Sequence, residues 1–264
     1  MSEAARTRWA LLAGNFAIGC GVMVAPGSLN DLVASLQVSV AVGGQLIAVS
    51  AVVMAVAAPL LAALVGGWDR RTLLVAALAW YALGHALSAL APDYAALLLL
   101  RAATVLAAAV FTPQAAAAIG VMTTPAERGR AITFIFLGWS LASVVGMPVH
   151  AWIGETFGWR WAFALVAVLA AIAAWWVWRA LPSGVRPPAM SLASWREALT
   201  HPGLMAIVLV TALASAGQFT LFTYFAPYYS QVFAASAAEI SLMFFWFGIF
   251  GLVGNLVLSR VVDR

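Results

Sequence analysis

The stretch of sequence that decides the fold is GWSLASVVGMPVHAWIGETFGWRWAF, residues 138–163. Five positions spaced by four residues share one face of a helix here, and four of the five carry almost no side chain: Gly138, Ala142, Gly146, His150 and Gly154. Such a stripe lets a second helix approach closely, which is how helices associate inside a lipid bilayer. Pro148 lacks a backbone donor, so we expect the helix to bend beside it.

The composition places the chain in a membrane. Hydrophobic residues make up 65% and charged residues 8% of the sequence, and the mean hydropathy is +1.01, which leaves too little polar surface to cover a soluble globule. The charges fall in short clusters between apolar runs of about 20 residues, the length that crosses a bilayer as a helix. Barrel strands would alternate over about ten residues instead. The sequence therefore predicts an all-α polytopic membrane protein.

Eight apolar runs predict membrane spans, at about 9–29, 41–65, 72–91, 94–122, 131–154, 159–181, 202–229 and 236–259. We expect residues 1–181 to form a six-helix N-terminal bundle and residues 182–201, with three prolines, to form a linker. The tail of this linker, Leu192 to Thr200, suits a short amphipathic helix at the membrane surface. Residues 202–264 would then supply the first two helices of an incomplete second bundle.

The arginines predict the orientation. Eleven of the 13 fall on one side of the predicted spans, whereas Asp31, Asp93, Glu155 and Glu239 fall on the other. The positive-inside rule makes the arginine side cytoplasmic, and an even number of spans then places both termini there. The apolar run after Arg8 is too long for a cleavable signal peptide. The absence of lysine and the abundance of alanine suggest a GC-rich bacterial genome, so we expect the bacterial inner membrane.

Four stretches carry a resemblance to a known family. They are residues 58–74, with Asp69, Arg70 and Arg71 in a loop; Leu100-Arg101; residues 138–163; and residues 223–228, TYFAPY. In this order and on these helices they resemble the major facilitator superfamily, in particular its bacterial drug and sugar (arabinose-type) efflux proton antiporters. The bland alternative for residues 138–163 is a tightly packed membrane helix with no further role.

The resemblance implies a mechanism and roles for several residues. It implies two six-span bundles that rock about a central cavity, with Asp69, Arg70 and Arg71 in a cytoplasmic gate loop. It also implies that Gly138, Ala142, Gly146, Pro148 and Gly154 form a helix-packing motif. Three positions depart from the pattern, namely Gly66 in place of an acidic residue, and Val105 and His150 in place of glycines. About four spans of the second bundle would be absent from this sequence.

Arg101, His150 and Asp31 are the candidates for proton coupling. The resemblance implicates Arg101, although an arginine near Asp93 can also snorkel to the outer interface. His150 titrates in the physiological range, but it can equally be bonded to a neighbouring helix, and we expect His85 to be structural. No carboxylate falls at the centre of any predicted span, which weakens the case for proton coupling.

Polar residues within apolar runs tend to face a bundle interior or water. We therefore expect a cavity lined by polar residues, with Phe222 as part of its apolar wall. The residues are Asn15, Gln45, Gln114, Gln218, Phe222 and Tyr224. Hydrogen bonds between helices, without substrate contact, are the alternative for each polar member of this set.

Several functions are excluded by missing motifs. The sequence has no Walker loop, no HExxH and no other metal-ligand spacing, so we expect no enzyme activity, no cofactor and no metal. The arginines do not gather on a soluble face, which argues against nucleic acid.

The expected partners are the lipid bilayer, a small-molecule substrate and protons, with a complementary chain for the missing helices as a further option. We expect a secondary active transporter that exports a drug-like or sugar compound by proton-coupled alternating access. The alternative is a truncated membrane protein without transport activity of its own, and we expect these 264 residues alone not to transport. We also expect Gly146→Leu to disrupt packing more than Gly14→Leu.

Overall fold

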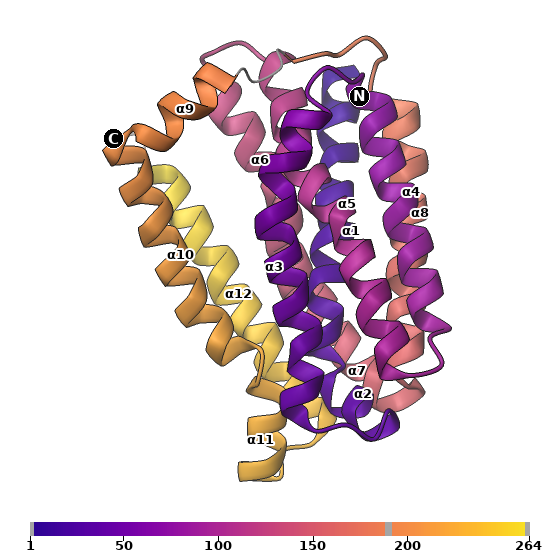
Figure 1. Ribbon diagram of the computed structural model, residues 1–264. Helices are drawn as coiled ribbons and strands as arrows, with labels where there is room; N and C mark the ends of the chain where they lie inside the picture. Colours follow the sequence, from indigo (N-terminus) through magenta and orange to yellow (C-terminus); the bar gives the residue numbers. More distant parts are fainter. Residues whose placement is uncertain (1–2, 188–191, 262–264) are drawn as a thin grey trace.

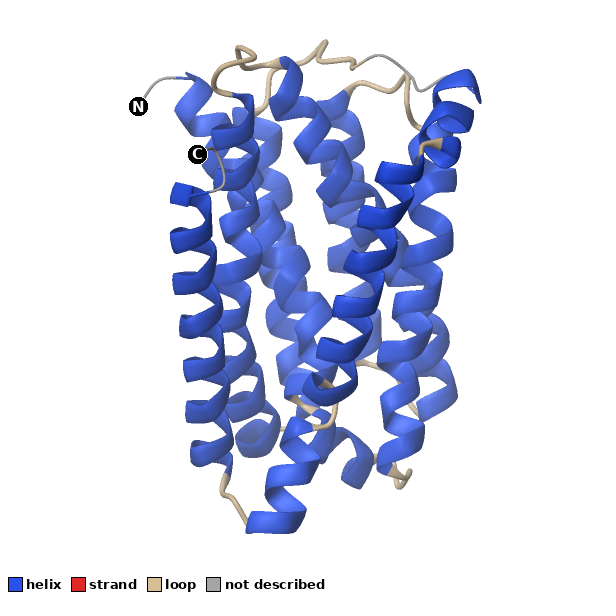
Figure 2. Ribbon diagram, turned by 90° about the vertical axis from the view of Figure 1, so that its left-hand side faces the viewer, coloured by secondary structure: helices blue, strands red, loops and turns tan. Residues whose placement is uncertain are grey.

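The computed structural model describes residues 3–187 and 192–261, and in these ranges every regular element is a helix (Figure 2). The elements are α1 (Glu3–Gly27), α2 (Leu29–Ser35), α3 (Val40–Leu64), α4 (Arg70–Ala89), α5 (Tyr94–Val121), α6 (Arg128–Leu141), the π-helical η1 (Ala142–Gly146), α7 (Met147–Phe157), α8 (Trp159–Ala180), α9 (Leu192–Thr200), α10 (Pro202–Phe222), α11 (Phe225–Phe233) and α12 (Ala237–Val261). Within the described ranges eight segments are long and apolar enough to cross a membrane. The prediction of an all-α protein with eight spans is confirmed.

Polar side chains mark where several spans begin. Ser39, Asp69 and Asp93 each accept a hydrogen bond from a backbone N–H three residues later, at 3.2, 3.1 and 2.8 Å. These bonds satisfy donors that the first turn of a helix leaves free. Gly158, with a φ of +97°, makes the sharp turn between α7 and α8, a backbone conformation that glycine adopts without a steric penalty.

The first six spans form one bundle around α1 (Figure 1). Helix α1 contacts α3, α4, α5, α6, α7 and α8, while α4 packs between α5 and α8. Near the amino end of α1, the hydroxyl of Thr7 donates to the carbonyl of Ala180 at 2.7 Å. This bond ties the start of the first span to the end of the sixth, so both lie at the same end of the bundle, here called the linker end.

The stripe of small residues predicted from the sequence lies against α1. A Cβ on Gly138 would lie 2.7 Å from the backbone nitrogen of Phe16, and a Cβ on Gly146 would lie 2.7 Å from the Cys20 sulfur. Ala142 packs on Gly19, His150 on Gly27 and Gly154 on Ser28. All five stripe positions therefore meet α1 or the residue that follows it.

The bend expected beside Pro148 takes the form of a π-helical turn, η1, directly before it. A proline at this position cannot donate to the carbonyl four residues earlier. The wider π turn accommodates that lost bond inside a continuous span. The predicted span over 131–154 is thus one membrane segment built from α6, η1 and α7.

The last two spans meet the bundle from its middle to the far end, opposite the linker end. Helix α12 packs on η1 and α7, and a Cβ on Gly248 would lie 2.6 Å from the Cα of Val144. The Ser241 hydroxyl donates to the carbonyl of Pro148 at 3.3 Å, and the Tyr224 ring covers Gly44. Toward the linker end, α10 and α12 diverge from the bundle (Figure 1), and the only buried residue of α10 is Phe222.

Some sequence predictions fall outside the described residues. Residues 188–191 of the linker, and the Asp263-Arg264 pair that would end the second bundle, belong to this group. The division into residues 1–181, 182–201 and 202–264 therefore stays a prediction.

We predict that Gly138→Ala lowers the thermal unfolding temperature in detergent, because the new methyl group would meet the backbone of α1. Overpacking of this kind costs about 1–3 kcal/mol. Gly217→Ala in α10 is the matched control, since a Cβ there has nothing within 4 Å and both changes bring the same gain in helix propensity. Equal melting temperatures for the two variants would contradict the packing role of the stripe.

The comparison of Gly146→Leu with Gly14→Leu stays a prediction. It does not isolate the stripe, because the Phe111 ring lies directly against Gly14. Both glycines sit in close helix–helix contacts, and this is why Gly217 replaces Gly14 as the control.

Candidate functional site

A buried polar cluster occupies the core of the six-span bundle. The Arg101 side chain on α5 is 1% exposed. Its Nη1 lies 3.3 Å from Nε2 of His85 on α4, and its Nη2 donates to the carbonyl of Val22 on α1 at 3.2 Å. The guanidinium also lies 6.0 Å from the centre of the Phe163 ring on α8. The arginine thus joins four helices and does not snorkel to the outer interface.

The cluster holds a positive charge without a carboxylate. Within the described ranges the one ion pair joins Arg8 and Glu127, and Nε of Arg101 has no hydrogen-bond partner. A buried, uncompensated charge is costly in a bilayer and marks a functional site by default. Arg101 is therefore the strongest of the three candidates for proton coupling.

The hydrogen bonds of His85 fix its tautomer. Its Nδ1 lies 2.9 Å from the carbonyl of Tyr81, which can only accept, so Nδ1 carries the proton and donates. Nε2 is then free to accept from Arg101. Tyr81 in turn donates from its hydroxyl to the carbonyl of Ile18 at 3.0 Å. A chain of hydrogen bonds therefore links α1, α4 and α5 with His85 neutral.

His150 lies fully buried at the α1 contact. Its ring nitrogens have no partner at full hydrogen-bond geometry, but the backbone of Cys20 on α1 lies close enough to act as a hydrogen-bond partner of the ring. The alternative of a histidine bonded to a neighbouring helix therefore stays open. His150 stays a candidate for a proton-sensitive contact.

Asp31 lies at the far end, in α2. Its Oδ2 accepts a hydrogen bond from the backbone N–H of Trp159 at 2.6 Å, and the Trp159 indole donates to the Ser35 hydroxyl at 2.6 Å. These bonds fasten α2 to the start of α8. The described contacts of Asp31 are thus with a helix terminus and not with the Arg101 cluster.

The loop with Asp69, Arg70 and Arg71 fastens the start of the linker. Gly184 donates its N–H to Oδ2 of Asp69 at 2.5 Å, and the backbone N–H of Arg70 donates to the carbonyl of Val185 at 2.9 Å. Arg71 lies 4.5 Å above the Trp178 ring. In this structure the loop holds the end of the N-terminal bundle to residues 184–185.

The departure at Gly66 has a structural counterpart. The Arg70 side chain is 2% exposed and donates to the carbonyls of Val65, Gly66 and Trp68 at 3.3, 3.2 and 2.7 Å. Gly66, which stands where the resemblance implies an acidic residue, therefore contributes a backbone acceptor. The Arg70 side chain caps the carboxyl end of α3.

Burial of the Asp69 carboxyl acts to raise its pKa, but hydrogen bonds from Thr72 and Gly184 and the charge of Arg186 outweigh it, so the pKa lies below the usual value. A lowered pKa means that the ionised carboxylate is the form that stabilises the folded loop.

The cavity-lining candidates do not share one environment. Asn15 is buried and bonded across spans, donating to the carbonyl of Ile135 at 3.1 Å and accepting from the Thr112 hydroxyl at 2.9 Å. This geometry matches the interhelical alternative. Gln114 is buried, whereas Gln45 and Gln218 are exposed.

The aromatic candidates lie at the far end. Phe222 packs among the rings of Phe219, Phe225, Phe244 and Phe247. Tyr224 covers Gly44 and so contacts the first bundle.

Reasoning from the sequence missed the pairing of His85 with Arg101. His85 lies four residues before the end of α4, and Arg101 lies seven residues after the start of α5. The connection between these antiparallel helices is short, so the two residues differ in depth by only about 5 Å, which the long arginine side chain can cross. Two polar residues on either side of a short turn are the signal that could have found the pair.

Eight spans with a buried, uncompensated charge in the first bundle define a polytopic membrane protein with the architecture of a solute transporter. The family model described as "Major Facilitator Superfamily" matches residues 11–264, so the chain belongs to the major facilitator superfamily. The predicted resemblance is confirmed. Membership of a transporter family also agrees with the prediction that the chain is no enzyme.

The chain is similar to several named bacterial proteins. It is 31% identical over 255 residues to the inner membrane transport protein YdhP of Escherichia coli K12, covering 97% of this chain and 66% of that protein. It is 30% identical to a probable sugar efflux transporter of Mannheimia succiniciproducens, covering 88% of this chain and 59% of that protein. The chain therefore spans less than two thirds of the length of these curated relatives.

Solved structures share the fold. A bacterial homologue of the human lysosomal transporter Spinster, in an inward-facing and unoccupied conformation, matches with a TM-score of 0.78 at 17% identity, over 100% of this chain and 64% of that one. A D-xylose–proton symporter matches with a TM-score of 0.73 at 17% identity, over 99% of this chain and 70% of that one.

We predict that His85→Phe lowers the melting temperature because it removes an acceptor from the buried charge of Arg101. Stranding a buried charge is strongly destabilising, whereas replacing the whole charged group by an apolar one of similar volume is often neutral. The double variant His85→Phe with Arg101→Met should therefore recover most of the loss. Thermal unfolding of the four proteins measures the coupling. A His85→Phe effect of the same size in both backgrounds would show that the two side chains are not coupled.

We predict that Asp69→Asn reduces protection of the Gly184 amide from hydrogen exchange at neutral pH. The difference from the unmodified protein should vanish in acid. The pKa of Asp69 is lowered in the folded protein, so its contribution is present above the unfolded-state pKa and is lost as the pH falls through the folded-state pKa. Exchange mass spectrometry of residues 181–187, corrected for the intrinsic rate, tests this. A difference that persists at pH values below both pKa values would contradict it.

Proposed function

We propose that these spans belong to a secondary active exporter of the bacterial inner membrane, with both termini cytoplasmic. The exported compound is a small drug-like or sugar molecule, and protons drive its export. The observation that carries the proposal is the asymmetric contact between the two groups of spans. They meet at the far end through Ser241 and Tyr224 and near the middle of the spans through Gly248, and they diverge toward the linker end (Figure 1).

This asymmetry suits alternating access, in which two bundles rock about a cavity at the middle of the membrane. Gly248 lies against the backbone of η1, and this contact would serve as the fulcrum. When the far end opens, the bond from Ser241 to Pro148 and the contact of Tyr224 with Gly44 would break. The loop with Asp69, Arg70 and Arg71 lies at the end that would close, and it would act there as the gate.

Proton coupling in this proposal depends on Arg101 and His150. A proton arriving on His150 would place a second charge in a core that already holds one unpaired guanidinium. The repulsion, strong in a medium of low dielectric constant, would favour separation of α7 from α1. Asp31 would contribute only indirectly, through the α2–α8 contact.

The names of similar proteins support the proposed substrate class. They include sugar efflux transporters, a purine ribonucleoside efflux pump of Shigella sonnei and a chloramphenicol resistance protein of Streptomyces lividans. The compounds in these names are small and carry several hydroxyl or amide groups. Gln45 and Gln218, which are exposed in this structure, would offer matching hydrogen-bond partners.

One observation favours a second candidate, a membrane protein that does not transport by itself. The exposed large apolar residues of α10 include Ile207, Val208, Leu209, Val210 and Leu213, and Phe222 is the only buried residue of this helix. Lipid can cover a helix that is apolar on all sides, but α10 would then form no wall of a closed cavity with the described spans.

We predict that this chain alone does not transport, whereas a chimaera that continues it with the remaining part of YdhP does. Proteoliposomes with an acidic interior are offered labelled arabinose, inosine and chloramphenicol, and accumulation is measured. Arg101→Met should abolish accumulation by the chimaera, with Arg196→Met on α9 as the matched control.

A monodisperse chimaera that accumulates none of the three compounds would overturn the exporter proposal. Accumulation by the chain alone would show instead that eight spans suffice.

A further inference from the structure

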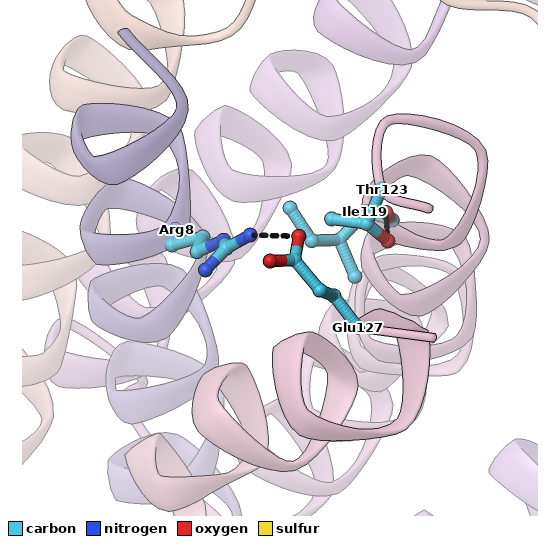
Figure 3. Close-up of polar contacts among 4 residues, drawn as sticks. All are labelled: Arg8, Ile119, Thr123 and Glu127. Carbon is cyan, nitrogen blue, oxygen red and sulfur yellow. Dashed lines mark hydrogen bonds and ion pairs between the residues drawn. The ribbon is translucent and has the colours of Figure 1, made fainter. Parts of the chain in front are cut away.

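A pocket lies between the first turns of α1 and the start of α6, at the linker end. Its volume is about 480 Å³, and it is lined by Arg8, Trp9, Glu127, Arg130, Phe134 and the alanines of the first turn of α1. Figure 3 shows Arg8 and Glu127 facing one another across the space between their helices. Neither side chain belongs to the Arg101 cluster.

The charged groups of this pocket have unused bonding capacity. Nη2 of Arg8 lies 3.7 Å from Oε2 of Glu127, which is too far for a hydrogen bond. Nε of Arg8 is buried without a partner, and Arg130 is exposed to solvent. The pocket therefore presents two guanidinium groups and one carboxylate, with a net charge of +1 by that count.

On α6, the apolar part of the pocket lies one helical turn further into the span than the charges. Phe134 follows Arg130 by one helical turn, so the two share a face of α6. The rings of Trp9 and Phe134 meet edge to face with their centres 5.0 Å apart, and Trp9 is 44% exposed. Charges at the helix ends with aromatic rings beneath them repeat the order of headgroup and acyl chain in a lipid leaflet.

We propose that this pocket binds the headgroup of phosphatidylethanolamine. The phosphate would accept hydrogen bonds from Arg8 and Arg130, as guanidinium groups bind phosphate, and the ammonium group would donate to Glu127. The acyl chains would run over Trp9 and Phe134. Basic pockets between spans at a membrane surface are a recurring site for lipid headgroups.

The single carboxylate distinguishes this lipid from others. A glycerol headgroup offers no cation to Glu127, and a choline headgroup carries a cation that cannot donate a hydrogen bond. Free phosphate would use the arginines but neither the carboxylate nor the aromatic rings. The pocket combines two positively charged hydrogen-bond donors, one carboxylate acceptor and two aromatic rings. This set matches a zwitterionic headgroup with a primary ammonium.

The test is lipid retention on the purified full chain. The protein is exchanged into nanodiscs of equal parts phosphatidylethanolamine, phosphatidylglycerol and phosphatidylcholine, and the lipids that remain bound after detergent release are counted by native mass spectrometry. We expect selective retention of phosphatidylethanolamine. Arg130→Gln should weaken it about tenfold, as expected for the loss of one charge-assisted hydrogen bond, and Arg196→Gln on α9 should not.

Glu127→Gln tests whether the carboxylate selects the headgroup. It should lower the preference for phosphatidylethanolamine over phosphatidylglycerol about tenfold by the same reasoning, while total retention persists. Equal retention of the three lipids by the unmodified chain would overturn the proposal, as would equal retention by Arg130→Gln and Arg196→Gln. Retention of inorganic phosphate in place of lipid would identify a plain anion site. Glu127 and Arg130 are both exposed at the start of α6, so the two variants should keep the fold. Their melting temperatures check this.

Discussion

The fold depends on a backbone contact between α1 and the segment made of α6, η1 and α7. Hydrophobic burial gives little drive for helices to associate in lipid, so close approach and dispersion must supply it. The stripe from Gly138 to Gly154 allows this approach over four turns of helix, and Gly19 and Gly27 of α1 lie on the other side of the same contact. Once α1 is held in this way, it lies at the centre and the other spans of the bundle pack around it.

The same segment serves both sides of the molecule. Its stripe faces α1, while the π turn that precedes Pro148 presents its backbone to Gly248 of α12. The π turn widens the helix locally and leaves the backbone of Ser143 and Val144 open to the glycine of α12. One irregular element therefore takes part in the packing of both groups of spans.

The sequence predicted the class, the spans and the packing face because each depends on a local pattern. Bilayer thickness sets the length of apolar runs, and a four-residue period sets a helix face. The partners within the candidate site could not be read in the same way. Whether Asn15 faces a cavity or bonds to Thr112 depends on the rotation of two helices, and the contact of His85 with Arg101 depends on their relative depth. Such rotations are set by tertiary packing and leave little trace in a single sequence.

The unpaired guanidinium of Arg101 also has an electrostatic consequence for the first bundle. Because its partners in the described ranges are neutral, the interior of this bundle carries a positive potential that water does not screen. A metal cation placed between α1, α4 and α5 would be repelled by this charge. In the proposed exporter, Arg101 would therefore oppose the leakage of sodium ions through the first bundle, as a fixed arginine excludes cations from other membrane pores, and the proposed route for the solute is the boundary between the two groups of spans.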